Sequence, residues 1–207
     1  MEEEWPIVTF ILVTINLGVF LIFFNSLEAI IYEFGLSPSY LLIRPYTLLT
    51  HMFVHADVLH FVGNMAMLFI LGLAVEDKIG SRKFLFIYLF SALCAIPFAF
   101  FIEVITAAPA IIVGASGAVF GVMFLAGLLS GWEKVPMLKI PLFIAIIFFL
   151  LFNLILLFLY FPYSISEFAH FGGFIGGALG FLLVLPKSKK VSKKAYNPNE
   201  SRTFEDR

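Results

Sequence analysis

The stretch IIVGASGAVFG, residues 111–121, places one hydroxyl group, Ser116, among glycines and alanines inside a strongly apolar chain. Small residues at helical spacing let two membrane helices approach closely. A lone serine at such a place either bonds to its own helix or takes part in chemistry. Both interpretations assume that the surrounding chain lies in a membrane.

The composition indicates a membrane protein. Of 207 residues, 61% are hydrophobic and 13% are charged, whereas a soluble domain has about 45–50% apolar and about 25% charged residues. A spanning helix needs about 20 mainly apolar residues. Six runs meet this need approximately, at 6–24, 52–74, 83–103, 114–131, 139–160 and 167–185.

The segment between the first two runs, residues 25–50, is too long for a tight turn and carries Glu28, Glu33 and Arg44. We expect it to form a structured interfacial loop. The sequence therefore predicts an all-α membrane protein, a bundle of six transmembrane helices with a structured outer loop between helices 1 and 2.

Basic residues predict the orientation of the bundle. Twelve of the thirteen Lys and Arg residues lie at 75–83, at 132–139 and in the tail from Lys187 onward, and Arg44 stands alone on the other side. Cytoplasmic loops carry the excess of Lys and Arg. We therefore expect a multi-pass protein of the cell membrane with both termini cytoplasmic. Residues 1–186 would form one six-span domain, and residues 187–207 a basic, disordered cytoplasmic tail.

The N-terminal sequence MEEEWP is acidic and lacks the basic region of a secretory signal, so the first apolar run is predicted to be a retained span.

Strongly polar residues are costly in a bilayer and by default face the protein interior. Here they gather in or directly before three of the six runs, as His51, His55, His60, Asn64, Ser116 and His170. His60 and Asn64 are four residues apart and share a helix face. With the predicted orientation, the second, fourth and sixth spans all begin near the outer side. Ser116, His170, His60 and Asn64 are therefore expected to converge just below the outer surface.

Glycine pairs suggest how the fourth and sixth spans meet. Gly117 and Gly121 are four residues apart, as are Gly173 and Gly177, and His170 lies on the same stripe as the second pair. Contact between these two glycine faces would bring His170 to Ser116. On their own, glycine pairs indicate plain helix packing more often than chemistry.

The four polar residues that converge have the chemistry of acyl transfer. A serine hydroxyl becomes a nucleophile when a neighbouring base takes its proton, and histidine is the usual base. The side chains of His60 and Asn64 and the backbone N–H of Ser116 could stabilise an oxyanion. Glu167 is better explained as an interfacial charge than as a third triad member. We therefore favour a dyad of Ser116 and His170.

The segments GASGAVFG, HMFVHADVLHFVGN and AHFGGFIGG occur in this order and resemble motifs of the rhomboid intramembrane serine proteases. The resemblance covers about residues 6–185 and implies that Ser116 is the nucleophile and His170 the general base. It also implies that His60 and Asn64 complete the oxyanion hole with the Ser116 amide.

The resemblance assigns further roles. Gly114 opens the serine motif, and Phe120 stands where some members have a tyrosine that stacks under the base; we assign both to substrate binding. His51 and His55 are expected to be structural and to hold the outer loop, and Gly173 and Gly177 to pack the sixth span. Glu76 and Gly80 match a family stretch.

The outer loop departs from the family pattern. Many members carry a Trp-Arg pair there, where this chain has Tyr46 and Thr47; the nearby Arg44 could substitute for that arginine.

The predicted activity is that of a serine endopeptidase that cleaves single-span membrane proteins near the outer end of their helix. It would use no cofactor and no metal, would bind no nucleic acid, and would correspond to the prokaryotic six-span form. The main alternative is a catalytically inactive rhomboid-like protein that binds transmembrane helices. A histidine-lined channel would need polar residues through the whole bilayer. A zinc protease would need a glutamate that HMFVH lacks, and an aspartyl protease would need aspartates within the spans.

Overall fold

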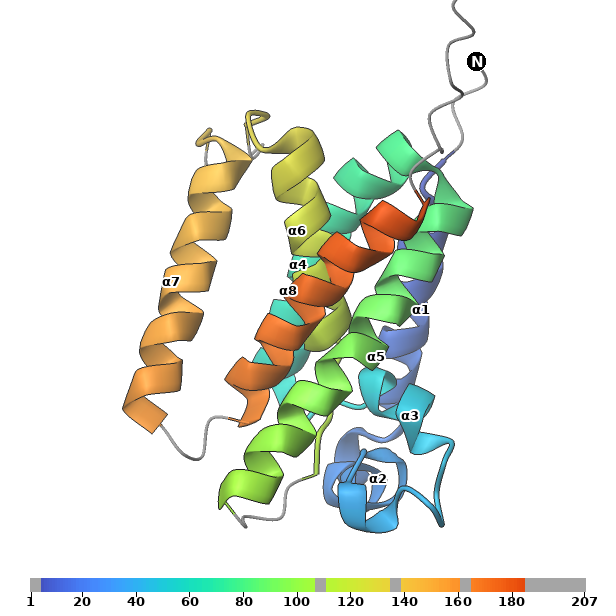
Figure 1. Ribbon diagram of the computed structural model, residues 1–207. Coiled ribbons are helices and arrows are strands. Elements are labelled where there is room, and N and C mark those ends of the chain that lie inside the picture. The colour runs from blue at the N-terminus through green and yellow to red at the C-terminus, as the bar shows by residue number, and fades with distance from the viewer. Residues whose placement is uncertain (1–4, 107–110, 135–138, 161–164, 185–207) are drawn as a thin grey trace, which may run out of the picture.

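A computed structural model describes residues 5–106, 111–134, 139–160 and 165–184. Within these ranges the chain is predominantly helical, and six long helices correspond to the six predicted runs (Figure 1). They are α1 (Ile7–Ile22), α4 (Val58–Ile79), α5 (Ser81–Thr106), α6 (Ser116–Ser130), α7 (Leu142–Tyr160) and α8 (Ile165–Val184). The predicted all-α membrane bundle is confirmed.

The helices differ in how well they suit a membrane span. By length and composition, α4, α5, α7 and α8 can each cross a membrane among the described residues. A fifth span results if α1 and the helical segment Phe24–Phe34 are counted as one broken span, with an angle of 61° between the two parts. Helix α6 has only 15 residues. It starts only at Ser116 because residues 111–115 are not helical, and Gly114 among them has a φ of +107° that a continuous helix does not allow.

Helix α4 begins later than the sequence predicts. Asp57 caps it, since the Asp57 carboxylate accepts a hydrogen bond from the backbone N–H of His60 at 2.8 Å. Residues His51–Phe53 form a separate 3₁₀ turn, η3, followed by an extended Val54. His51 and His55 therefore lie outside α4, and only His60 and Asn64 are carried by it.

The segment between α1 and α4 is ordered, as predicted. It contains η1 (Phe24–Ser26), α2 (Leu27–Phe34), η2 (Pro38–Tyr40) and α3 (Thr47–Thr50). Figure 1 shows α2 and α3 together at one end of the bundle. The start of α1, the end of α8 and the turn between α4 and α5 lie at the opposite end.

Arg44 anchors this outer segment. Its guanidinium donates to the Tyr32 carbonyl at 2.8 Å, pairs with Glu33 at 3.4 Å and lies 4.8 Å from the centre of the Tyr32 ring. The Tyr46 hydroxyl donates to Glu33 at 2.8 Å. Arg44 and Tyr46 thus hold the outer segment against α2. That Arg44 takes the place of the family's arginine stays a prediction.

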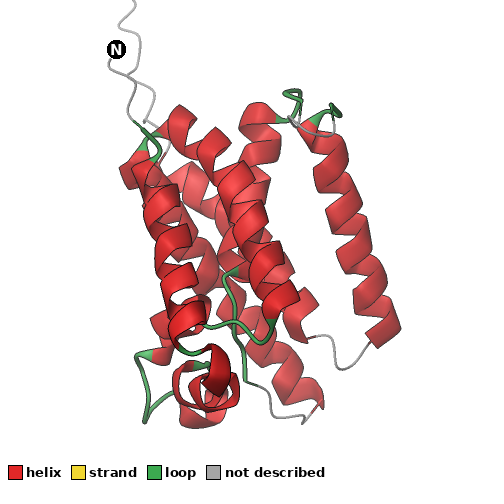
Figure 2. Ribbon diagram, turned by 180° about the vertical axis from the view of Figure 1, so that it is seen from behind, coloured by secondary structure: helices red, strands yellow, loops and turns green. Residues whose placement is uncertain are grey.

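The buried apolar core is built mainly from α4, α5 and α6, with α1 packed against it. Helix α8 packs on α5 and α6 through its glycines, and α7 stands at the edge of the bundle (Figures 1 and 2). Of the 18-residue apolar stretch of each helix, 11% is buried inside the molecule in α7, compared with 39% in α4 and 41% in α5. Most of α7 therefore faces lipid, as its phenylalanine-rich sequence predicts.

A buried carboxylate joins three helices at the end opposite the outer loop. Glu76 of α4 is 2% exposed. It accepts hydrogen bonds from the backbone N–H groups of Val8 and Thr9 at 2.8 and 2.7 Å, from the Thr9 hydroxyl at 2.7 Å and from the Ser81 hydroxyl at 2.6 Å. The first amides of a helix lack internal partners and favour a negative charge. Glu76 therefore caps α1 and holds it against α4 and α5.

Replacing Glu76 with glutamine is expected to lower the stability of the fold by roughly 1.5–3 kcal/mol, because the charge-assisted bonds are lost and an amide NH₂ would face backbone donors. The unfolding temperature in detergent measures the effect. Asp77→Asn is the matched control, since Asp77 is the exposed neighbour on the same helix. Equal unfolding temperatures for the two variants would refute the capping role.

Candidate active site

Backbone hydrogen bonds from the outer segment hold the non-helical residues 112–114, which precede α6. Leu36 and Ile112 exchange two backbone hydrogen bonds, of 2.9 and 2.8 Å, and the Gly114 N–H donates to the His51 carbonyl at 2.9 Å. Gly114 has φ +107°, in the region that favours glycine. A Cβ atom there would also lie 2.6 Å from His60 Nε2. The backbone conformation thus favours glycine where α6 begins, and a side chain there would also displace the His60 ring.

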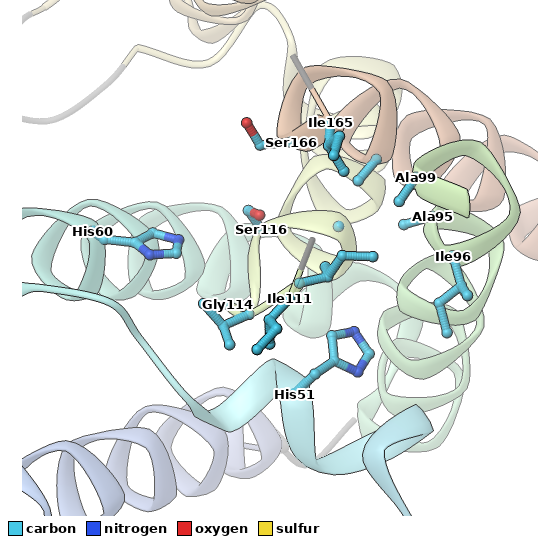
Figure 3. A pocket seen from close by; sticks show the side chains of 14 residues that line it. His51, His60, Ala95, Ile96, Ala99, Ile111, Gly114, Ser116, Ile165 and Ser166 are labelled. Carbon is cyan, nitrogen blue, oxygen red and sulfur yellow. The ribbon is translucent and has the colours of Figure 1, made fainter. Parts of the chain in front are cut away.

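Ser116 is the first residue of α6 and lies between two cavities. The first, of about 320 Å³, is lined by His51, Ile111, Ala95 and Ala99 among others. Figure 3 shows it, with the His60 ring extending from α4 towards Gly114 and Ser116. The second cavity, of about 580 Å³, lies between α4, α6 and α7. Ser116 is half-buried and lines both.

The predicted contact between glycine faces occurs. Cβ atoms added to Gly173 and Gly177 of α8 would overlap the backbone of Gly117 and Gly121 of α6, respectively. The two helices therefore touch backbone to backbone. This approach places His170 in the larger cavity with Ser116, His60 and Asn64.

The four residues that the sequence predicts to converge do converge. No hydrogen bond joins Ser116 Oγ to His170 among the described residues, and such bonds often form only when substrate is bound.

The His170 ring is held on two sides. It stacks on Phe120, with ring centres 4.2 Å apart and planes 5° from parallel. Its Nδ1 lies 2.7 Å from Oδ1 of Asn153, on α7. Sequence reasoning did not select Asn153. The available signal was a lone amide inside an otherwise apolar span, which the membrane penalises unless it faces the protein.

Hydrogen-bond donors lie near the start of α6. Asn64 Nδ2 donates to the His60 carbonyl at 2.9 Å, which leaves its second N–H free for another partner. His60 Nδ1 accepts from the Ala56 N–H at 3.4 Å. In the neutral ring Nε2 then carries the proton, beside Gly114. The Ser116 amide, at a helix start, lacks an intrahelical partner. Three donors can therefore serve an oxyanion here.

His51 and His55 lie in the segment directly before α4. His51 Nδ1 donates to the Thr47 carbonyl at 2.8 Å, and its own carbonyl holds Gly114. His55 is 1% exposed, with its ring centre 5.2 Å from that of His60. Burial lowers the pKa of both histidines, and that of His55 to about 3. These contacts support the predicted structural roles, which stay predictions.

Acidification is expected to destabilise the fold through His55. Its ring stays neutral in the folded state, whereas the unfolded chain takes up a proton below the ordinary pKa of 6.5. Stability therefore falls as the pH drops from about 6.5 towards 3, by up to about 1.4 kcal/mol per pH unit. Unfolding temperatures of the wild type and His55→Gln between pH 7 and pH 4 measure this. Equal pH slopes for the two proteins would contradict it.

Comparison with known proteins decides the family. A family model described as a rhomboid domain matches residues 43–187. The chain belongs to the rhomboid family. It is 37% identical to RHOMBOID-like protein 7 of Arabidopsis thaliana over 142 residues, covering 67% of this chain and 42% of that protein. It is 27% identical to Rhomboid-like protease 3 of Toxoplasma gondii over 144 residues, covering 68% and 52%.

The chain spans about half the length, or less, of these curated rhomboid relatives. They come from Arabidopsis thaliana and Toxoplasma gondii, so they do not confirm a prokaryotic form. The predicted tail, residues 187–207, lies outside the described residues. Within the described ranges, His, Cys, Asp and Glu side chains form no group of three that could hold a metal ion.

Proposed function

We propose that this rhomboid is an intramembrane serine endopeptidase that cleaves single-span membrane proteins near the outer end of their transmembrane helix. The observation that carries the proposal is the larger cavity, in which Ser116, His170, His60 and Asn64 face the apolar side chains of α7. A nucleophile, a base and oxyanion donors thus border one space at a protein–lipid boundary. The name of the Toxoplasma gondii relative also supports protease activity.

Acylation would begin when His170 takes the proton of Ser116 and the serine oxygen attacks the scissile carbonyl carbon. The developing oxyanion would be held by the Ser116 amide and by the side chains of His60 and Asn64. His170 would then give the proton to the leaving amine, and the peptide bond would break. In the second half a water molecule would lose a proton to His170 and attack the acyl carbon. His170 would then return that proton to Ser116 Oγ as the acyl C–O bond breaks, so that the carboxylic acid fragment leaves and the dyad is restored.

The substrate would enter beside α7. Of the four long spans this helix is the least buried, and together with α4 it borders the larger cavity. Carbonyl groups of an intact helix are hydrogen-bonded and shielded, so a substrate helix must unwind locally to present one to Ser116. Gly114 lines the smaller cavity and Phe120 the larger one, and both would contact the unwound segment.

The proposed location is the cell membrane, with both termini in the cytoplasm and the site towards the outer face. The basic turn between α4 and α5 lies at the end of the bundle where α1 begins, away from α2 and α3. Lys78 there pairs with Glu133 and donates to the Leu129 carbonyl at 3.0 Å. The excess of basic residues at this end supports a cytoplasmic placement.

The test is cleavage of a tagged single-span substrate by the wild-type protein in liposomes. We expect two fragments, and mass spectrometry of their new ends should place the cut near the end of the substrate helix that lies level with α2 and α3. Uncut substrate that co-purifies with the protein would support the inactive, helix-binding alternative. A cut at the opposite end would contradict the proposed geometry.

A further inference from the structure

Asn153 is a polar residue of the larger cavity to which the proposed reaction assigns no role. It lies in the middle of α7, in the sequence LFIAIIFFLLFNLILLFLY. The side chains of its neighbours Phe152 and Leu154 are exposed, whereas that of Asn153 is partly buried and lines the larger cavity. An amide in such a helix is costly unless it meets a partner inside the protein.

The contacts of Asn153 fix the orientation of its amide. Oδ1 lies 2.7 Å from His170 Nδ1, and Nδ2 lies 3.4 Å from the Glu167 carbonyl, one turn earlier on α8. A carbonyl oxygen can only accept a hydrogen bond, so the group facing Glu167 is the NH₂ group. The group facing His170 is then the amide oxygen, which also can only accept.

It follows that His170 Nδ1 must carry the proton. In a neutral imidazole one nitrogen donates and the other accepts, so Nε2 is left as the base. Phe120 stacks on the face of the ring and cannot distinguish the two nitrogens. Among the described residues, Asn153 makes the one hydrogen bond to the His170 ring.

We propose that Asn153 is a positioning residue that holds His170 in the Nδ1–H tautomer, with Nε2 free to take the Ser116 proton. The role as a catalytic aid rests on the proposed function, whereas the tautomer itself does not. Because Asn153 belongs to α7 and His170 to α8, the base is oriented only while α7 lies against α8. An outward movement of α7 would release the ring.

The first experiment needs no proteolysis. The chain has four histidines, so ¹⁵N-histidine labelling with one His→Gln variant at a time assigns the ring signals. We expect His170 to show the Nδ1–H tautomer in the wild type and to lose that preference in Asn153→Leu. An Nε2–H tautomer in the wild type, or an unchanged spectrum in the variant, would overturn the proposal.

The second experiment measures kcat, KM and their pH dependence. Asn153→Leu is expected to lower kcat roughly 10- to 100-fold, by analogy with the loss of a hydrogen-bond partner of a metal-bound histidine, with KM little changed. Asn153→Asp keeps an acceptor and adds a charge that favours the imidazolium. It should retain activity and move the acid limb of the pH–rate profile to higher pH.

Leu156→Ala is the control, because Leu156 lies one turn further along α7 and lines the same cavity without a hydrogen bond to His170. If Leu156→Ala and Asn153→Leu lose kcat equally, and the pH–rate profile of Asn153→Asp is not shifted, Asn153 contributes only to packing. If the wild type cleaves nothing while the tautomer changes as expected, the proposed function fails and the positioning of His170 stands.

Discussion

Replacing Ser116 with alanine is expected to lower the rate of substrate cleavage by roughly 10⁴-fold or more, because loss of the nucleophile of a serine protease removes the covalent route. Binding of the substrate should be little changed, since the larger cavity keeps its other lining residues. Quantitative gel analysis of cleavage in liposomes measures the rate. Unfolding temperatures should match those of the wild type, because Ser116 is half-buried at a helix start.

Ser166→Ala is the matched control. Ser166 lines both cavities beside Ser116, and its hydroxyl donates to Glu167 at 2.9 Å (Figure 3). It should retain cleavage within a few-fold of the wild type. Equal activity of the wild type and Ser116→Ala would show that another group performs the attack, and equal loss in both serine variants would point to a general effect on the cavity.

Replacing Gly173 with alanine is expected to reduce both stability and activity. The added methyl group would overlap the backbone of Gly117, so α8 must move away from α6. Overpacking of this kind costs roughly 1–3 kcal/mol. His170 lies one turn from Gly173, and a displacement of about 1 Å at a reacting group can cost roughly 10²-fold in rate. Unfolding temperature and kcat are the two measurements.

Gly18→Ala is the control for the loss of a glycine. A Cβ atom at Gly18 of α1 meets nothing within 4 Å, so this variant should be as stable as the wild type or slightly more so. Wild-type activity in Gly173→Ala would show that close contact between α6 and α8 is not needed to position His170.

Much of the fold could be predicted because the membrane imposes strong rules. Long apolar runs specify spans, and the glycine stripes of 117–121 and 173–177 specify which helices touch. The convergence of Ser116, His60, Asn64 and His170 followed from spacing and from the alternating direction of the spans. All four line one cavity.

Other features depended on local contacts that no periodicity encodes. The late start of α4 follows from Asp57, whose capping bond separates η3 from the helix. The short α6 follows from Gly114, because its backbone conformation and its place between His51 and His60 are properties of the folded loop. Asn153 was recognisable as an unusual residue, yet its partner on α8 appears only when the helices are packed.

The most direct test of the central claim is reaction of the purified protein with a fluorophosphonate, followed by peptide mapping. The reagent labels a serine whose hydroxyl is activated by a neighbouring base. We predict a single adduct on Ser116 in the wild type and a large loss of that adduct in His170→Gln. An adduct on another residue, or equal labelling of Ser116 with and without His170, would contradict a catalytic dyad of Ser116 and His170.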